Sequence, residues 1–248
     1  TYSIRKFGKS FKSFVEINFI DNPEAIDVFK GAKNSTDILF RLSAMTTVPL
    51  IKGETLIFFD EVQKYPKAVE AIMSIKHQKP ELPVCMISST VGTIVHEAEY
   101  KEEWYPLILY PMTFEEFLTA NKAQDLCKHI ENQKLEPVGE DVIEQITEYL
   151  KIFYIVGGMP IVVLDYVKNK DLNRVDAILK ALLMRTQEYI EAEVPKAYAA
   201  KVDRIWESIP AQMEKDNRKF MYQYVDEKAR AREYEKSVNW LVDTGLVR

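Results

Sequence analysis

Residues 55–61, with the sequence TLIFFDE, decide the fold class: four large apolar residues are followed by two acids. A continuous apolar run of this length predicts a strand that is covered on both faces, as in parallel sheets. Asp60 and Glu61 would then lie at the carboxyl end of the strand, where open α/β sheets bind their ligands. In phosphate chemistry the first acid can hold Mg²⁺ and the second can polarise an attacking water. The same pattern also fits a strand that ends in a solvated acidic turn.

Three further short apolar segments, at residues 14–19, 84–87 and 107–110, predict strands on either side of this one in the sequence. The first alternates apolar and polar residues, and the last ends at Pro111. Between the strands at 56–59 and 84–87, Pro66 precedes a one-sided apolar stripe that predicts a helix, formed by Ala68, Val69, Ile72 and Met73. Strand and helix alternate, which predicts a parallel α/β sheet.

After Pro111, helical spacing replaces the apolar runs. Thr113 and Glu116 have the spacing of a capping box at the start of a helix. Two longer stretches with helical spacing follow, at 142–153 and 172–190, and the first of them is ended by Gly157-Gly158-Met159-Pro160. Residues from about 119 to 200 are therefore expected to be helical.

The residues after about 200 predict a helix, a strand and a second helix. Residues 202–213 are a helix candidate that contains Pro210, and residues 220–225 are β-prone. Residues 229–244 are helical in pattern and end at Gly245, with one apolar side formed by Tyr234, Val238, Leu241 and Val242. This succession has the size of a winged-helix module that the chain leaves incomplete.

Composition limits the class of protein. The 248 residues are 47% hydrophobic and 29% charged, near the averages of globular proteins, and no apolar run approaches the roughly 18 residues of a membrane helix. A formal charge of −5 argues against a globally basic nucleic-acid-binding protein and leaves a local basic face open. The two cysteines, Cys85 and Cys127, predict reduced thiols in a cytoplasmic protein. The three histidines lack the spacing of a zinc site, so no metal site built by the protein alone is expected.

A phosphate-binding loop is the feature that an acid pair of this kind needs. Gly8-Lys9-Ser10 has the form of the end of a GxxxxGK[ST] loop, but Ser3 stands where the first glycine should be. Ile4, Phe7 and Phe11 are also spaced as one face of a helix. None of the 8 glycines forms GxGxxG, so we expect no phosphate loop within these residues.

Ser88 and Ser89 follow the predicted strand at 84–87. Because the carboxyl ends of parallel strands share one edge of the sheet, these hydroxyls are expected near Asp60 and Glu61. A hydroxyl there could sense a terminal phosphate or fix the attacking water. An ordinary polar turn after a strand would have the same sequence.

From Thr1 to Arg248 the chain resembles the prokaryotic AAA-type ATP-binding proteins that carry a C-terminal domain of unknown function. The resemblance is carried by TLIFFDEVQ at 55–63, YPMTFEEFL at 110–118, VGGMP at 156–160 and ARAREY at 229–234. It implies an α/β fold: a parallel-sheet P-loop ATPase core over residues 1–118 that lacks its first strand. A helical lid over 119–200 and an incomplete winged-helix module over 201–248 would follow.

The resemblance also implies roles for four residues. Thr1 would be the phosphate-loop hydroxyl and Asp60 the Walker B acid, both binding the cofactor through Mg²⁺, so ATP and Mg²⁺ are the expected cofactors. Glu61 would be the catalytic base and Ser89 the sensor of the terminal phosphate. In one departure, Glu103 stands eight positions before Pro111, where family members usually have a basic residue.

These features together predict a cytoplasmic, Mg²⁺-dependent ATPase, a hydrolase that would be inactive as given because the resemblance places the phosphate loop directly before Thr1. The alternative is a nucleotide-gated regulator or DNA-binding adaptor with little turnover. Residues 201–248 contain ten basic and nine acidic side chains, a net charge of +1, which gives DNA binding little support. A protein partner or self-association stays open, and no membrane contact is expected.

Overall fold

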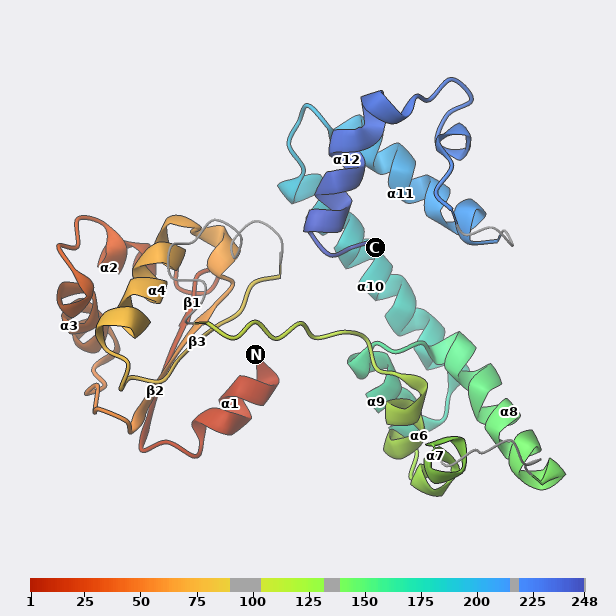
Figure 1. The fold of residues 1–248 in the computed structure, drawn as a ribbon, viewed down its shortest axis with the longest axis horizontal. Coiled ribbons are helices and arrows are strands. Elements are labelled where there is room, and N and C mark those ends of the chain that lie inside the picture. Colours follow the sequence, from red (N-terminus) through yellow and green to blue (C-terminus); the bar gives the residue numbers. More distant parts are fainter. Residues whose placement is uncertain (90–103, 132–138, 215–218, 248) are drawn as a thin grey trace. The chain divides into compact units, whose positions relative to one another are not determined.

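The computed structural model describes residues 1–89, 104–131, 139–214 and 219–247. Two compact units are present, one formed by residues 1–107 together with the chain from Lys196 onward, and the other by residues 108–195. Figure 1 labels the helices and strands of each unit. The domain boundaries predicted at 118 and 200 stay a prediction.

A parallel sheet of three strands, in the order β1-β2-β3, forms the centre of the first unit. The strands are β1 (Ser13–Asn18), β2 (Thr55–Asp60) and β3 (Val84–Met86). Asn18 is the register partner of Asp60, and Met86 is the partner of Phe59, so the carboxyl ends of all three strands meet at one edge. The strands predicted at 14–19, 56–59 and 84–87 are confirmed, and so is their parallel arrangement.

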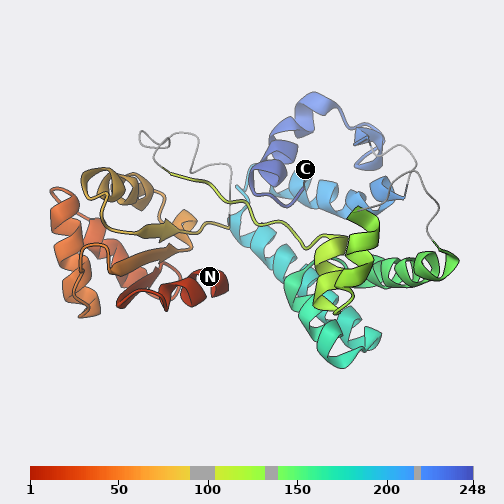
Figure 2. The same ribbon diagram turned by 60° about the horizontal axis from the view of Figure 1, so that its bottom comes forward.

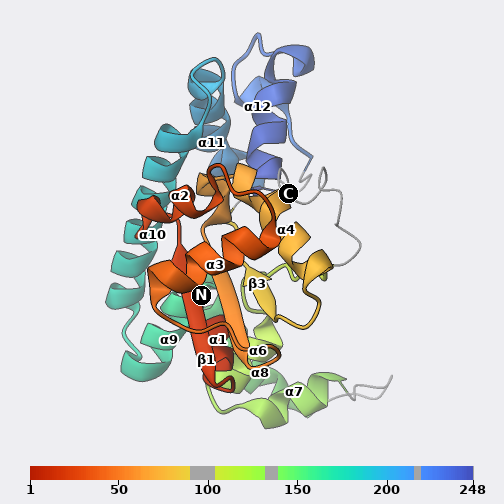
Figure 3. The same ribbon diagram turned by 90° about the vertical axis from the view of Figure 1, so that its left-hand side faces the viewer.

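Strand β2 is buried along its whole length because it lies between the other two strands and is covered on both faces. Ile57 and Phe59 point into the core on the face covered by α2 (Ile26–Phe29), α3 (Ser35–Thr46) and α4 (Lys67–Gln78) (Figure 3). On the opposite face, Phe58 stacks on Phe14 with ring centroids 6.2 Å apart. Close packing on both faces fixes the position of β2 and therefore the position of the acids at its carboxyl end.

Two helices of the first unit match the sequence pattern. The predicted stripe after Pro66 lies on α4, and all four of its side chains are buried. The other helix, α1 (Tyr2–Gly8), lies close to β1: a Cβ on Gly8 would come within 2.6 Å of the Phe14 ring. The segment Gly8-Lys9-Ser10 therefore ends a helix, as its spacing predicted, and does not follow a strand as a phosphate loop does.

The strand predicted at 107–110 is wrong. Residues 104–113 have no regular secondary structure, and the side chains of Leu107 and Leu109 are 80% and 86% exposed. An apolar segment becomes a strand only where a neighbouring backbone completes its hydrogen bonds. No strand among the described residues pairs with it.

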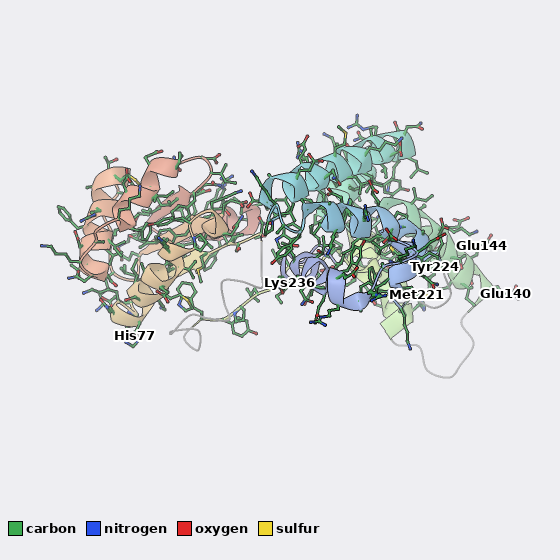
Figure 4. All side chains as sticks on the ribbon, turned by 90° about the horizontal axis from the view of Figure 1, so that it is seen from above. His77, Glu140, Glu144, Met221, Tyr224 and Lys236 are labelled. Carbon is green, nitrogen blue, oxygen red and sulfur yellow. The ribbon has the colours of Figure 1, made fainter. Side chains whose placement is uncertain are left out.

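The second unit is helical, as predicted for the region that follows Pro111 (Figure 2). Its helices are α6 (Phe114–Ala120), α7 (Gln124–Glu131), α8 (Glu140–Val156), α9 (Pro160–Asn169) and α10 (Leu172–Glu193). The capping box is confirmed: Glu116 N–H donates to Thr113 Oγ1 and Thr113 N–H donates to Glu116 Oε2, at 3.3 and 2.8 Å. Phe117 is fully buried among these helices, whereas Glu140 and Glu144 at the start of α8 are exposed (Figure 4).

The glycine pair between α8 and α9 makes a tight turn. Gly157 has a φ of +69°, which a side chain would strain. The Gly158 carbonyl accepts the Met112 N–H at 2.7 Å, and a Cβ on Gly158 would lie 2.4 Å from the Met112 carbonyl oxygen. Backbone atoms cannot move aside as a flexible side chain can, so only glycine fits at this position.

Gly158→Ala is expected to lower the free energy of unfolding of the second unit by about 1–3 kcal/mol, the usual cost of overpacking. Denaturant unfolding followed by circular dichroism measures the change. Gly139→Ala is the comparison, because its Cβ would meet only the flexible side chain of Asp141, and a smaller change, below about 1 kcal/mol, is expected. Equal unfolding midpoints for the two variants would contradict the close approach of Gly158 to Met112.

The C-terminal part of the first unit contains α11 (Ala199–Met213) and α12 (Ala231–Asp243), which pack on each other. Gly245, with a φ of +75°, follows the end of α12, as predicted. The strand predicted at 220–225 is wrong, since Tyr222–Tyr224 forms a 3₁₀ turn and residues 219–247 contain no strand that could pair with it. Val242, predicted on the buried side of its helix, is 46% exposed, and Ser237 is buried there instead.

The structure thus shows an α/β core with a three-stranded parallel sheet and helical regions after it. Within the described residues, no helix combines the length and the apolar character that crossing a membrane requires.

Candidate functional site

Asp60, the first acid after the apolar run, lies at the end of β2 and is 2% exposed. Its Oδ2 accepts hydrogen bonds from Thr1 Oγ1 at 2.9 Å and from Asn18 Nδ2 at 3.3 Å. Its Oδ1 accepts the backbone N–H of Glu61 at 3.1 Å. A buried carboxylate requires such donors, and these three hold the Asp60 carboxylate in one orientation.

Two of the three donors to Asp60 are side chains from other parts of the chain. Thr1 precedes α1, and its hydroxyl does not cap that helix but donates to Asp60 instead. Asn18 ends β1, where its Oδ1 accepts the N–H groups of Ile20 and Asp21 at 2.8 and 3.1 Å. These two bonds fix the amide so that Nδ2 faces Asp60. Sequence reasoning missed Asn18, although an asparagine at the end of a strand beside an acidic strand end was a usable signal.

Glu61 adopts a left-handed backbone conformation, with φ 57° and ψ 41°. For a residue other than glycine this costs on the order of 1 kcal/mol or more, and such residues persist where the surroundings fix them. Two backbone bonds do so here: Val62 N–H donates to the Ile87 carbonyl at 3.1 Å, and Ile87 N–H donates to the Phe59 carbonyl at 2.8 Å. The chain therefore turns sharply after Asp60 and directs the Glu61 side chain toward the end of β3.

Ser89, the predicted sensor, lies beside Glu61. Its Oγ donates to Glu61 Oε2 at 3.2 Å, with a longer contact of 3.5 Å to Oε1. Gln63 joins this pair: its Nε2 donates to Glu61 Oε2 at 2.5 Å, and its Oε1 accepts the Ser89 N–H at 3.3 Å. Gln63 lies in the 3₁₀ turn η2 (Val62–Lys64), and sequence reasoning gave it no role.

One ion pair, between Arg5 and Glu16, lies near the acid pair. Arg5 of α1 donates to both carboxylate oxygens of Glu16 on β1, at 2.6 to 3.0 Å. The hydrogen bonds from Arg5 to Glu16 raise the pKa of the guanidinium, and the negative charge of Asp60 contributes in the same direction.

On β3, burial raises the pKa of the Cys85 thiol, which keeps it neutral and a poor nucleophile.

Thr1 and Asp60 fit the requirements of a magnesium ion in a phosphate site. Both offer hard oxygen atoms, and those atoms lie within hydrogen-bonding distance of each other. In the described part of the chain, no group of three or more His, Cys, Asp and Glu side chains is placed to hold a metal. Mg²⁺ commonly takes one or two protein oxygens and completes its shell with phosphates and water, so this pair suits a metal that arrives with a nucleotide.

The structure therefore brings together all four predicted site residues at the carboxyl edge of the sheet, namely Thr1, Asp60, Glu61 and Ser89. Their chemical roles stay predictions. Glu103, the departure from the family pattern, lies outside the described residues.

A buried parallel strand that ends in two acids, with a threonine hydroxyl bound to the first acid, is the arrangement of P-loop nucleoside triphosphatases. Residues 1–118 match the AAA domain family, and residues 147–248 match a domain of unknown function (DUF8612). The chain thus combines a match to an AAA domain with a match to this C-terminal domain, which confirms the resemblance drawn from the four sequence phrases.

Among solved structures, the Walker-type ATPase PABY2304 of Pyrococcus abyssi is similar to this chain, with a TM-score of 0.50 and 12% sequence identity. The similarity covers 94% of this chain and 78% of that protein. At this identity the likeness supports the fold alone. None of the curated proteins matches the sequence.

Proposed function

We propose that the sheet edge around Asp60 binds Mg²⁺ and ATP and that the whole protein hydrolyses ATP to ADP and phosphate. The observation that carries the proposal is the hydrogen bond of 2.9 Å from Thr1 Oγ1 to Asp60 Oδ2. A P-loop hydroxyl and a Walker B aspartate share the metal in such enzymes. The match of residues 1–118 to the AAA domain family supports nucleotide binding at this edge.

Thr1 and Asp60 are the residues that would hold the metal, which when bound neutralises charge on the nucleotide phosphates. Asn18 and the Glu61 N–H keep the Asp60 carboxylate facing Thr1. Because Asp60 is almost fully buried, the pair is oriented before any ligand arrives. Such preorganisation is the main source of electrostatic stabilisation in enzymes.

Glu61 would act on the attacking water. As the water oxygen forms a bond to the γ-phosphorus, the bond from that phosphorus to the β,γ-bridging oxygen breaks and ADP leaves. The proton of the water passes to the Glu61 carboxylate and from there to solvent. The hydroxyl of Ser89, 3.2 Å from Glu61 Oε2, would lie beside the water or the terminal phosphate.

Hydrolysis of this kind uses a phosphate loop, and no GxxxxGK[ST] segment occurs among the 248 residues. Accordingly, these 248 residues alone are expected to show no turnover, and activity is measured on the whole protein. Binding of ATP by the whole protein without hydrolysis would favour the alternative of a nucleotide-gated regulator.

Asp60→Asn tests the metal site. The amide keeps the shape of the side chain but loses the negative charge, so the Mg²⁺ concentration for half-maximal ATP hydrolysis is expected to rise about 10- to 100-fold. A magnesium titration of ATP hydrolysis measures it. Asp165→Asn is the matched control, since Asp165 pairs with Arg174 on the helical unit and no change is expected. An unchanged magnesium dependence in Asp60→Asn would remove Asp60 from the metal site.

A further inference from the structure

The side chain of Gln63 is held at both ends of its amide. Its Oε1 accepts the backbone N–H of Ser89 at 3.3 Å, and its Nε2 donates to Glu61 Oε2 at 2.5 Å. A backbone N–H can only donate, so this bond assigns the oxygen end of the amide. The NH₂ end must therefore face the carboxylate of Glu61.

The hydrogen-bond donors around Glu61 converge on one of its two oxygens. Oε2 accepts from Gln63 Nε2 at 2.5 Å and from Ser89 Oγ at 3.2 Å, while from the residues that the structure describes Oε1 has only the longer contact of 3.5 Å to the same hydroxyl. An ionised carboxylate has about four acceptor sites. The arrangement thus fixes Oε2 and leaves Oε1 with acceptor capacity for a water molecule.

The turn that carries Glu61 does not need the Gln63 side chain to close. Val62 N–H donates to the Ile87 carbonyl, and Ile87 N–H donates to the Phe59 carbonyl, and both bonds are between backbone atoms. The backbone bonds therefore fix the position of the Glu61 main chain, and the Gln63 amide fixes the position of the Glu61 carboxylate. Bonds to an ionised acceptor are about twice as strong as those between neutral groups.

We infer that Gln63 is a positioning residue of the catalytic site: anchored to the backbone N–H of Ser89, its amide holds Glu61 Oε2 so that Oε1 is presented to the attacking water. This inference rests on the proposed hydrolysis of ATP, and Gln63 itself does not touch the reacting atoms. Its effect belongs to the catalytic step, because misplacing a catalytic group by about 1 Å can cost on the order of 10²-fold in rate.

Gln63→Met tests the inference in the whole protein, since methionine keeps the length of the side chain and removes both hydrogen bonds. The expected result is a kcat about 10- to 100-fold lower, with a KM for ATP within about threefold of the unaltered protein. Gln78→Met is the matched control: Gln78 is exposed at the end of α4, where it bonds to Ser74, and its kcat is expected to stay unchanged.

A double variant separates positioning from a structural role. If Gln63 acts only through Glu61, the variant Glu61→Gln/Gln63→Met is expected to turn over ATP within about twofold of Glu61→Gln alone. Losses that multiply, or full turnover in Gln63→Met, would overturn the inference and leave the proposed function standing. Absence of ATP hydrolysis in the unaltered protein would overturn both, and the two failures are therefore distinguishable.

Discussion

Glu61→Gln is expected to lower the ATP turnover of the whole protein by about 10²- to 10⁴-fold, the usual contribution of a positioned base. The amide has the shape of the carboxylate but cannot accept the proton of the attacking water. The left-handed turn is fixed by backbone bonds on either side of Glu61, so the substitution leaves the fold intact. Steady-state hydrolysis measures turnover, and a fluorescent ATP analogue measures binding, which should change less than about threefold.

Glu70→Gln is the matched control for this prediction. Glu70 is exposed on the first turn of α4 in the same unit, and the exchange removes the same charge. Its turnover is expected to equal that of the unaltered protein. Turnover in Glu61→Gln close to that of the control would show that another group activates the water, and it would contradict the proposed role of Glu61.

The site residues that the sequence could predict are those whose positions follow from the parallel sheet. The apolar run of β2 is long enough and continuous enough to identify a buried strand, and the acids that follow it are then placed by the geometry of a parallel sheet. The hydroxyl of Ser89 lies near Glu61 for the same reason, because β3 is parallel to β2 and ends at the same edge. Thr1 was assigned only through the resemblance to a family, since nothing in its local sequence indicates a ligand.

The features that the sequence did not predict correctly are determined by contacts with residues far along the chain. Residues 107–110 and 220–225 have apolar or aromatic patterns typical of strands, yet no strand among the described residues pairs with either one. Strand propensity mostly reflects packing against neighbours, so the same pattern gives an exposed segment at one site and a 3₁₀ turn at the other. Asn18 and Gln63 were missed because their roles come from register and from a turn, which residue type alone does not specify.

The largest effect on stability is expected at Phe59. This side chain is fully buried, stacks on Phe19 with ring centroids 6.4 Å apart, and contacts Phe29 edge to face at 6.0 Å. Phe59→Ala removes these contacts and leaves a cavity in the core, into which the surrounding structure relaxes only in part. The free energy of unfolding is expected to fall by about 3–5 kcal/mol. Hydrogen exchange at the backbone amides of β2 and β3 reports the unfolding of this sheet separately from the helical unit.

Phe40→Ala provides the comparison, because Phe40 on α3 is 74% exposed and the same substitution there should change stability by less than about 0.5 kcal/mol. Phe59 also connects the core to the site, since it precedes Asp60 and its carbonyl accepts the Ile87 N–H that helps to fix the turn. Loss of its ring should therefore raise the exchange rate of the Ile87 amide more than that of amides in α3. Equal protection of Ile87 in the two variants would mean that the turn holds its acids without support from the core.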